Sequence, residues 1–211
     1  MMIIPQTEIS KQTPYLGSLF VRWAEFMYSR VRFNMPDSIV HAHAHCERVL
    51  LHALAIGNAL FGEDEVALTI LAHASVFHDT RRQDEYLDRG HGARAAVYYR
   101  EFCGANDDIR YYPEAAFLMR FHDMDDDFGI AAIKKVFGDD AERCLKLYAI
   151  FKDADALDRW RLGPRGLDIR FLRTAKAREL NDYARALVVS TMPMNIRKAL
   201  WDAVERLWRK G

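Results

Sequence analysis

Residues 66–82 read VALTILAHASVFHDTRR, an apolar run that ends on two adjacent ionisable side chains followed by Thr and two arginines. The run from Val66 to Phe77 has the composition of a buried helix. A buried ionisable group is costly unless it is paired or bound to a metal ion. His78 and Asp79, side by side at the end of this run, therefore indicate a functional site.

The overall composition fits one folded domain with a sizeable hydrophobic core. The chain has 211 residues, of which half are hydrophobic. Lys and Arg number 30 together, as do Asp and Glu, so the formal net charge is zero. Such a chain lacks the broad positive field that attracts nucleic-acid polymers or anionic membranes. We therefore expect neither a nucleic-acid polymer nor a membrane as a partner. A zero net charge is still compatible with a local basic pocket.

Cysteine usage and the first residues predict a cytoplasmic protein. The cysteines are widely spaced and form no C-x-x-C pair, which is typical of reduced, mostly buried thiols. The opening stretch, MMIIPQTEISKQTP, lacks the basic and apolar segments of a signal peptide. No uninterrupted apolar stretch approaches the ~20 residues needed to span a bilayer. The cysteines are Cys46, Cys103 and Cys144.

Helical periodicity runs along most of the chain, and strand-like alternation is hard to find. We predict one all-α domain over residues 1–211, with a core of about 36–162 and C-terminal helices of about 168–210 packed on it. Asp37 and Ser38, after Pro36, form a plausible N-cap for the first long helix. The expected helices are 38–61, 65–77, 91–104, 113–122, 128–137 and 140–160, then 171–190 and 196–210 after a GPRG turn at 163–166.

The last predicted helix carries a stripe of large apolar residues. Trp201 and Trp208 are seven residues apart, a spacing that places them on one helix face. This is a packing stripe, which could form a homodimer face, rather than a platform for stacking bases. Its other members are Leu200, Val204 and Leu207.

Six polar side chains could converge from the ends of several of these helices. Imidazole and carboxylate groups suit Zn, Fe, Mn, Co or Ni, and bundle cores commonly hold such sites. Adjacent ligands are possible at a helix end, because the chain leaves its regular path of ~100° per residue there. The six candidates are His45, His78, Asp79, His91, His122 and Asp153.

The order of these residues, H…HD…D, resembles the HD-domain superfamily of metal-dependent phosphohydrolases. Flanking residues make the likeness specific over roughly residues 39–162. They are H-x-x-R-V from His45, an apolar run into His78-Asp79, HG-x-x-A from His91, and D-A-D-x-L-D-R from Asp153 to Arg159.

The resemblance implies a multi-helix bundle around a metal site and one or two divalent ions per chain, which could be Mn, Fe, Co, Zn, Ni or Mg. It implies His45, His78, Asp79 and Asp153 as ligands, with His91 and His122 for a second ion that Asp79 would bridge. The substrate would be a small phosphorylated molecule, with nucleotide-like molecules as the leading class, attacked by metal-activated water. Residues expected at the phosphate or in catalysis are Asp79, Arg81, Arg82, His91 and His122.

One departure from the family pattern bears on the substrate. Many dinuclear HD phosphodiesterases have Gly then Lys after HD-x, whereas this chain has Arg81 and Arg82. We therefore do not expect hydrolysis of cyclic dinucleotides. Asp84, Glu85 and Asp88 are open alternatives for a general acid or base.

Two other functions remain open at this stage. The same six ligands could hold a di-iron centre that activates O₂, or the metal could stabilise a non-catalytic binding module.

Neighbouring polar residues have plainer interpretations. His41 could line the pocket, His52 and His73 are expected in or beside the core, and Arg48 could hold a carboxylate. The acidic stretch FHDMDDDFG, residues 121–129, is interpreted as a solvated turn.

Overall fold

The computed structural model describes residues 2–208, and these contain helices but no β-strand, so the prediction of an all-α fold is confirmed. The α-helices are α1 (Gln6–Ile9), α2 (Pro14–Arg30), α3 (His43–Phe61), α4 (Glu65–Phe77), α5 (His91–Gly104), α6 (Pro113–Phe121), α7 (Asp126–Phe137), α8 (Ala141–Leu157), α9 (Ala175–Glu179), α10 (Asn181–Thr191) and α11 (Met194–Trp208). Short 3-10 helices are η1 (Gly138–Asp140), η2 (Asp158–Leu162) and η3 (Ile169–Phe171).

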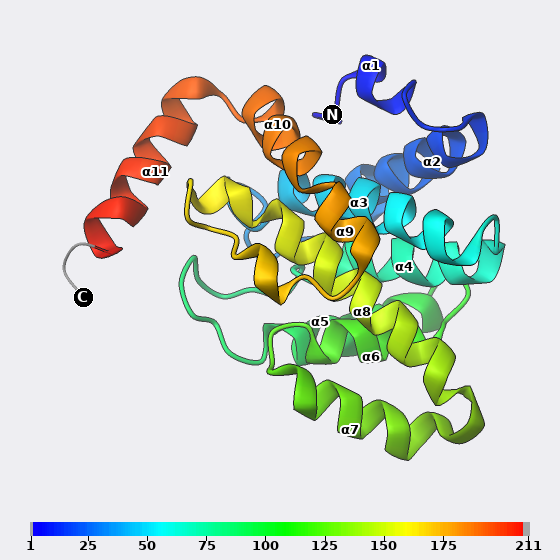
Figure 1. The fold of residues 1–211 in the computed structure, drawn as a ribbon. Coiled ribbons are helices and arrows are strands. Elements are labelled where there is room, and N and C mark those ends of the chain that lie inside the picture. The colour runs from blue at the N-terminus through cyan, green and yellow to red at the C-terminus, as the bar shows by residue number, and fades with distance from the viewer. Residues whose placement is uncertain (1, 209–211) are drawn as a thin grey trace.

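The long helices α3 and α4 pack side by side through the middle of the molecule, and α8 packs across them (Figure 1). α2 covers α3, while α5 and α6 form a second pair below (Figure 1). One hydrophobic cluster runs through all of these helices, from Ile4 to Val188. It packs α4, α6 and α8 against one another, which brings together the polar candidates at and just beyond their C-terminal ends.

The first long helix begins later than the sequence suggests. α3 starts at His43, so the predicted N-cap at Asp37 and Ser38 is wrong. Ser38 instead forms a turn, in which its hydroxyl accepts the backbone N–H groups of Val40 and His41 and donates to Glu85. Short-range bonds of this kind compete with helix formation. The non-helical segment places His41 beside the start of α3.

The predicted helix over residues 171–190 is split into α9 and α10. The hydroxyl of Thr174 caps α9 by accepting the N–H of Ala177 at 3.1 Å. A buried carboxylate on α8, that of Asp153, accepts the N–H groups of Arg173 and Thr174 just before this cap. A new helix start is thereby fixed inside an otherwise helical pattern.

The C-terminal helix α11 extends away from the body of the molecule (Figure 1). It is held at η2, where the indole N–H of Trp201 donates to the carbonyl of Arg161 at 3.1 Å. Trp201 thus contacts its own chain, while the side chains of Leu207 and Trp208, members of the predicted stripe, lie outside what the structure describes. The homodimer stays a prediction.

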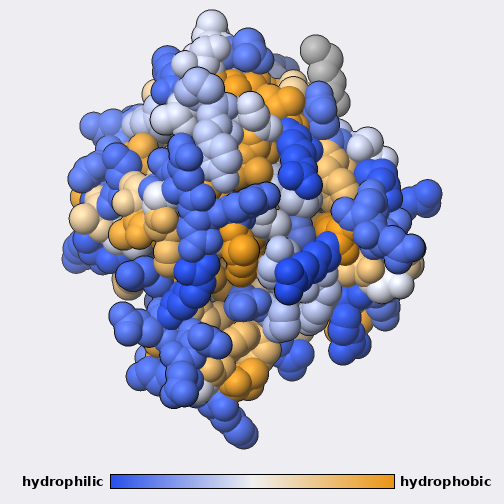
Figure 2. Space-filling view, turned by 90° about the vertical axis from the view of Figure 1, so that its right-hand side faces the viewer, coloured by the Kyte–Doolittle hydropathy of each residue, from blue (hydrophilic) through white to orange (hydrophobic). Residues whose placement is uncertain are grey.

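The face at the right of Figure 1, where α3 turns into α4, carries mostly hydrophilic side chains with smaller hydrophobic areas between them (Figure 2). Within residues 2–208, no helix combines the length and the apolar character needed to cross a bilayer.

Candidate metal centre

His45 and His78 form the first half of the centre. His45 lies in the first turn of α3, and His78 follows the last residue of α4; both are fully buried. Their Nε2 atoms are 3.0 Å apart. Nδ1 of His45 faces Oδ2 of Asp158 at 2.7 Å, and Nδ1 of His78 faces the carbonyl of Ser75 at 2.9 Å. Each Nδ1 therefore carries the ring proton, and each Nε2 presents a lone pair.

His91 and His122 repeat this arrangement. His91 begins α5 and His122 follows the last residue of α6, and their Nε2 atoms are 2.9 Å apart. Their Nδ1 atoms face the carbonyls of Asp88 at 2.6 Å and of Met119 at 2.7 Å. A carbonyl can only accept a hydrogen bond, so both rings carry the proton on Nδ1. The Nε2 atoms of this second pair therefore also point at the centre.

Asp79 lies between the two pairs and turns one oxygen to each. Oδ2 is 3.6 Å from Nε2 of His45, whereas Oδ1 is 3.0 Å from Nε2 of His91 and 3.4 Å from Nε2 of His122. Oδ1 is buried and makes no hydrogen bond within residues 2–208. A buried carboxylate oxygen without a hydrogen-bond donor is costly, and this one faces the Nε2 atoms of two imidazoles.

These contacts fit metal ions. Lone pairs of two imidazoles and a carboxylate repel one another unless a cation lies among them. Two nitrogens that each lie ~2.1 Å from one ion are about 3 Å apart when the ion's bond angle is near 90°. Two such groups occur, His45–His78–Asp79 and Asp79–His91–His122, each with its ligand atoms within 4.8 Å of one another. Buried His and Asp side chains could thus hold metal at two adjoining positions.

The protonation states suit metal binding. Burial acts to raise the pKa of Asp79, yet the neighbouring imidazoles, His78 foremost, hold it well below its ordinary value. Burial lowers the pKa of His78 to about 3, so its ring is neutral at pH 7. Burial opposes a charge on His122, but its contact with Asp79 raises the pKa of this ring. A metal ion would displace that proton, as ligands must be deprotonated.

Asp155, rather than the expected Asp153, lies beside the first group. Oδ1 of Asp155 is 3.3 Å from Nε2 of His45 and 4.0 Å from Nε2 of His78. Both oxygens of Asp153 instead accept hydrogen bonds from Arg173 and Thr174. The side chain of Asp153 is thus directed to the start of α9 and away from the first group, so its predicted position at the centre is wrong, while the identity of the last ligand stays a prediction.

The two arginines that follow the HD pair are also placed differently from the expectation. Arg81 points out of the site, donating to the carbonyl of Arg32 at 2.6 Å and lying over the ring of Tyr98. Arg82 lines the site, with Nη1 3.9 Å from Oδ1 of Asp79, but its other nitrogens donate to the carbonyls of Asp84 and Tyr86. Arg81 thus lies away from the centre, whereas Arg82 lines it and also holds the loop before α5, and a phosphate contact of either arginine stays a prediction.

Close packing at Gly92 explains how the second pair forms. A Cβ atom at this position would lie 2.3 Å from the carbonyl oxygen of Met119 and 2.8 Å from Nδ1 of His122. Only glycine lets the start of α5 approach the end of α6 so closely. The HG sequence thereby brings His91 against His122.

The centre opens into a hollow of about 470 Å³. Its walls include His41, whose Nδ1 is 3.2 Å from Oδ2 of Asp79. Of the three acid–base alternatives Asp84, Glu85 and Asp88, Glu85 is the one among its lining residues. A neighbouring hollow of about 630 Å³ shares part of this wall. The residues that line both are His122, Met124, Asp125, Asp155 and Arg159.

The acidic stretch after α6 is less solvated than expected. The side chain of Asp123 is 7 % exposed, and it accepts the backbone N–H of Gly90 at 2.8 Å. It therefore helps to hold the start of α5 beside the centre, and only part of this stretch is a solvated turn.

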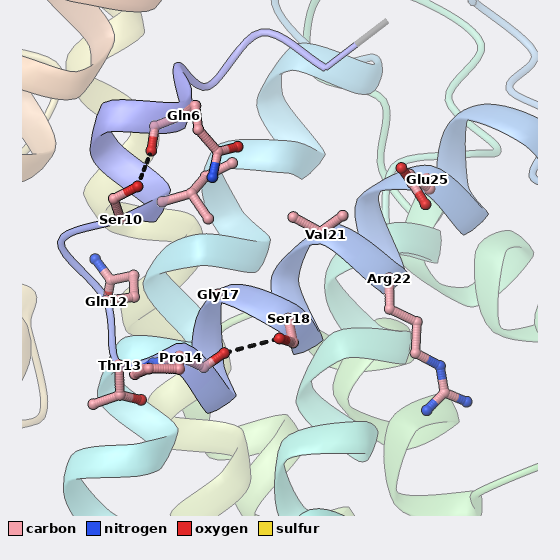
Figure 3. Close-up of a pocket in the computed structure, with 11 residues that line it drawn as sticks. Gln6, Ser10, Gln12, Thr13, Pro14, Gly17, Ser18, Val21, Arg22 and Glu25 are labelled. Atoms are coloured by element: carbon pink, nitrogen blue, oxygen red, sulfur yellow. Dashed lines mark hydrogen bonds between the residues drawn. The ribbon is translucent and has the colours of Figure 1, made fainter.

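Size alone does not single out this site. Another hollow of about 630 Å³ lies between α1 and α2 (Figure 3), where Arg22 and Glu25 are the charged lining residues. It contains no His–Asp group of the kind described above.

Sequence reasoning missed Asp155, Asp158 and Arg161. A helical signal was available for the first two, since Phe151, Asp155 and Asp158 follow the i, i+4, i+7 spacing of one face. Phe151 packs against His78 and His122, with ring centres 5.5 and 6.1 Å apart. The face that carries Phe151 therefore points at the centre.

Comparison with known proteins adds no family or relative: no protein-family model, no curated protein and no solved structure matches this chain.

Proposed function

We propose that this chain is a metal-dependent phosphohydrolase of the HD type, which acts on a small phosphorylated molecule. The observation that carries the proposal is the position of Asp79, whose two oxygens face separate pairs of buried imidazoles. A carboxylate placed in this way suits a bridge between two ions. The order H…HD…D in the sequence agrees with this arrangement, with Asp155 as the last ligand.

Each group of ligands has a defined part in holding metal. His45, His78, Asp79 and Asp155 would hold one ion, and Asp79, His91 and His122 would hold another. A bound divalent ion supplies Lewis-acid chemistry, which polarises a phosphate ester and makes water nucleophilic at neutral pH. The Nδ1 hydrogen bonds of the four imidazoles keep their Nε2 atoms aimed at the centre.

Other residues of the chain would orient the substrate and move protons. Glu85 lies on the wall of the hollow and accepts a hydrogen bond from Ser38 at 2.9 Å, which fixes its carboxyl group there. It can take a proton from water or give one to a leaving oxygen. Arg82 places a cation on the same wall, where it favours an anionic substrate.

A panel of phosphate monoesters and nucleotides tests the proposal, with protein loaded in turn with Mn, Fe, Co, Zn, Ni or Mg. We expect release of phosphate with at least one metal, and a loss of at least about 1,000-fold in Asp79→Asn. Asp168→Asn, in the neighbouring hollow, should retain activity. Metal binding without hydrolysis of any member would contradict the proposal, and O₂ uptake by the iron-loaded protein would replace it with oxygenase chemistry.

A further inference from the structure

Arg161 is a buried cation at the metal centre whose hydrogen-bonding capacity is mostly unused. It lies in η2 and is 4 % exposed. Its Nε donates to the carbonyl of Val40 at 2.7 Å. Within residues 2–208, Nη1 has no hydrogen-bond partner, and no hydrogen bond from Nη2 is present either. Guanidinium groups rarely stay buried in this condition, because each unpaired N–H has lost its water.

The guanidinium belongs to the wall of the same hollow. Arg161 lines it together with His41, Asp79 and Asp155. Its ionic neighbour is Asp158, with Nη1 of Arg161 and Oδ2 of Asp158 3.6 Å apart. The carboxylate of Asp158 already accepts hydrogen bonds from Arg48 and His45. Burial lowers the pKa of Arg161 while these carboxylates act to raise it. Arg161 therefore remains a cation whose charge is only partly compensated.

Charge balance shows what would be needed once metal binds. The centre and the wall of its hollow contain six carboxylates, of Asp79, Glu85, Asp123, Asp125, Asp155 and Asp158, and four guanidinium groups, of Arg48, Arg82, Arg159 and Arg161. One divalent ion balances this deficit of two positive charges, and a second ion produces an excess of two. Excess charge in a site of low dielectric is stabilised by a bound anion.

We propose that Arg161 is the residue that binds an anionic oxygen of the substrate beside the metal centre, a phosphate oxygen in the class of substrates proposed above. The inference rests on that proposed function for the substrate class. A guanidinium can donate two parallel hydrogen bonds to such an oxyanion, and Nη1 and Nη2 are the donors still free. Arg81 and Arg82 suit this role less well. Arg81 donates to the carbonyl of Arg32 and is not among the lining residues of the hollow, while Nε and Nη2 of Arg82 donate to carbonyl groups and its Nη1 faces the ring nitrogens of His91.

Binding of inorganic phosphate tests the inference without relying on turnover. Phosphate is titrated calorimetrically into the Mn-loaded wild type and into Arg161→Met, Arg161→Lys and Arg165→Met, with metal content and melting temperature measured for each. Arg165 is the matched control, since it is an exposed arginine on the neighbouring hollow. We expect phosphate to bind at least about tenfold more weakly to Arg161→Met and to an intermediate degree to Arg161→Lys. Arg165→Met should match the wild type.

Equal phosphate affinity of Arg161→Met and wild type, at equal metal content, would overturn the inference. Should Arg161→Met fail to fold, Arg161→Lys decides, because it keeps the charge but loses the forked pair of donors. The two proposals can fail separately. Arg161-dependent phosphate binding without hydrolysis removes the phosphohydrolase but keeps the anion site. Hydrolysis by the wild type, with unchanged phosphate binding in Arg161→Met, keeps the phosphohydrolase but removes Arg161 as the anion site.

Discussion

Nδ1 of His45 and Oδ2 of Asp158 form a 2.7 Å hydrogen bond between residues 113 positions apart in the sequence. The same carboxylate accepts hydrogen bonds from Nε and Nη2 of Arg48, and all three side chains are fully buried. Asp158 thus both orients the ring of His45 and neutralises the buried guanidinium of Arg48. Hydrogen bonds to the second nitrogen of a metal-binding imidazole hold its ring and raise its basicity.

Replacing Asp158 with Asn should weaken metal binding by about 10- to 100-fold, because the ring of His45 loses its anionic acceptor. The free energy of unfolding should also fall by about 3 kcal/mol, since Arg48 is left as a buried cation without its partner. Competition with a chromophoric chelator measures the first quantity and urea unfolding the second. Asp168→Asn is the control, because Asp168 pairs with the exposed Arg170 and lies away from the His–Asp groups. Unchanged metal affinity in Asp158→Asn would show that the hydrogen bond is not needed.

Asp153 and Asp155 should give opposite results when each is changed to Asn. Asp155→Asn removes a ligand and should lower metal content while leaving the metal-free protein about as stable as before. Asp153→Asn should keep its metal but lose about 3 kcal/mol of stability, because it loses charge-assisted bonds to Arg173 and Thr174. Elemental analysis and urea unfolding of both variants provide the test. Loss of metal in Asp153→Asn alone would restore the original assignment.

His91→Ala should reduce the metal content from near two ions per chain to near one, because Asp79 and His122 cannot hold the second ion alone. Protein purified without chelator is suitable for this measurement. His52→Ala is a useful comparison, since His52 is also buried but belongs to neither His–Asp group. One ion in both wild type and His91→Ala would mean a mononuclear centre. Iron as the main metal would favour the oxygenase alternative.

Gly92→Ala should cost about 1–3 kcal/mol of stability, because the new methyl group forces α5 away from the carbonyl of Met119. The shift also separates His91 from His122, so metal content should fall toward one ion per chain. Gly104→Ala is the matched control at the other end of α5, where a Cβ atom meets nothing within 4 Å. This control should be neutral or slightly stabilising. Equal stability and metal content in the two variants would refute the packing argument.

His73 should make the protein less stable as the pH falls. Burial, followed by the charge of Arg22, lowers the pKa of His73 to about 3, from an ordinary value of about 6.5. Below pH ~6.5 the unfolded chain therefore binds a proton on this ring that the folded chain does not bind. The share of the free energy of unfolding that depends on neutral His73 is thus fully present above this pH and is lost as the pH falls toward 3.

The expected loss from His73 is about 2 kcal/mol between pH 7 and pH 5. His73→Gln should lose correspondingly less stability over this interval. Urea unfolding at both pH values, with a chelator present, measures the difference. Identical pH dependence of variant and wild type would mean that His73 titrates normally in the folded protein.

The all-α class and the bounds of several helices could be predicted because they follow from local patterns. α4 ends at Phe77, α5 starts at His91 and α6 starts at Pro113, as the apolar run, the Gly-rich start and the proline indicate. The start of α3 could not be predicted, because Ser38 is held in a turn by Glu85, which is 47 residues away.

In the candidate centre too, the residues marked by local motifs could be predicted, whereas those that depend on helix packing could not. The structure brings His45, His78, Asp79, His91 and His122 together, as the motifs suggest, although their role as ligands stays a prediction. Asp153 and Asp155 are two positions apart on α8 and so point about 200° away from one another. Which one faces the centre depends on how α8 rotates against α3 and α4. The helical spacing groups Asp155 with Phe151 and Asp158 on one face, but it does not say that this face points at the centre.

The two histidine pairs also bear on the stability of the whole fold. His45 and His78 are 33 residues apart, and His91 and His122 are 31 apart. An ion held by either pair would therefore act as a reversible cross-link that closes a loop of about the same length, restricting the unfolded chain as a disulfide does. In a protein whose cysteines are all free, such cross-links would make the free energy of unfolding rise with the metal supply.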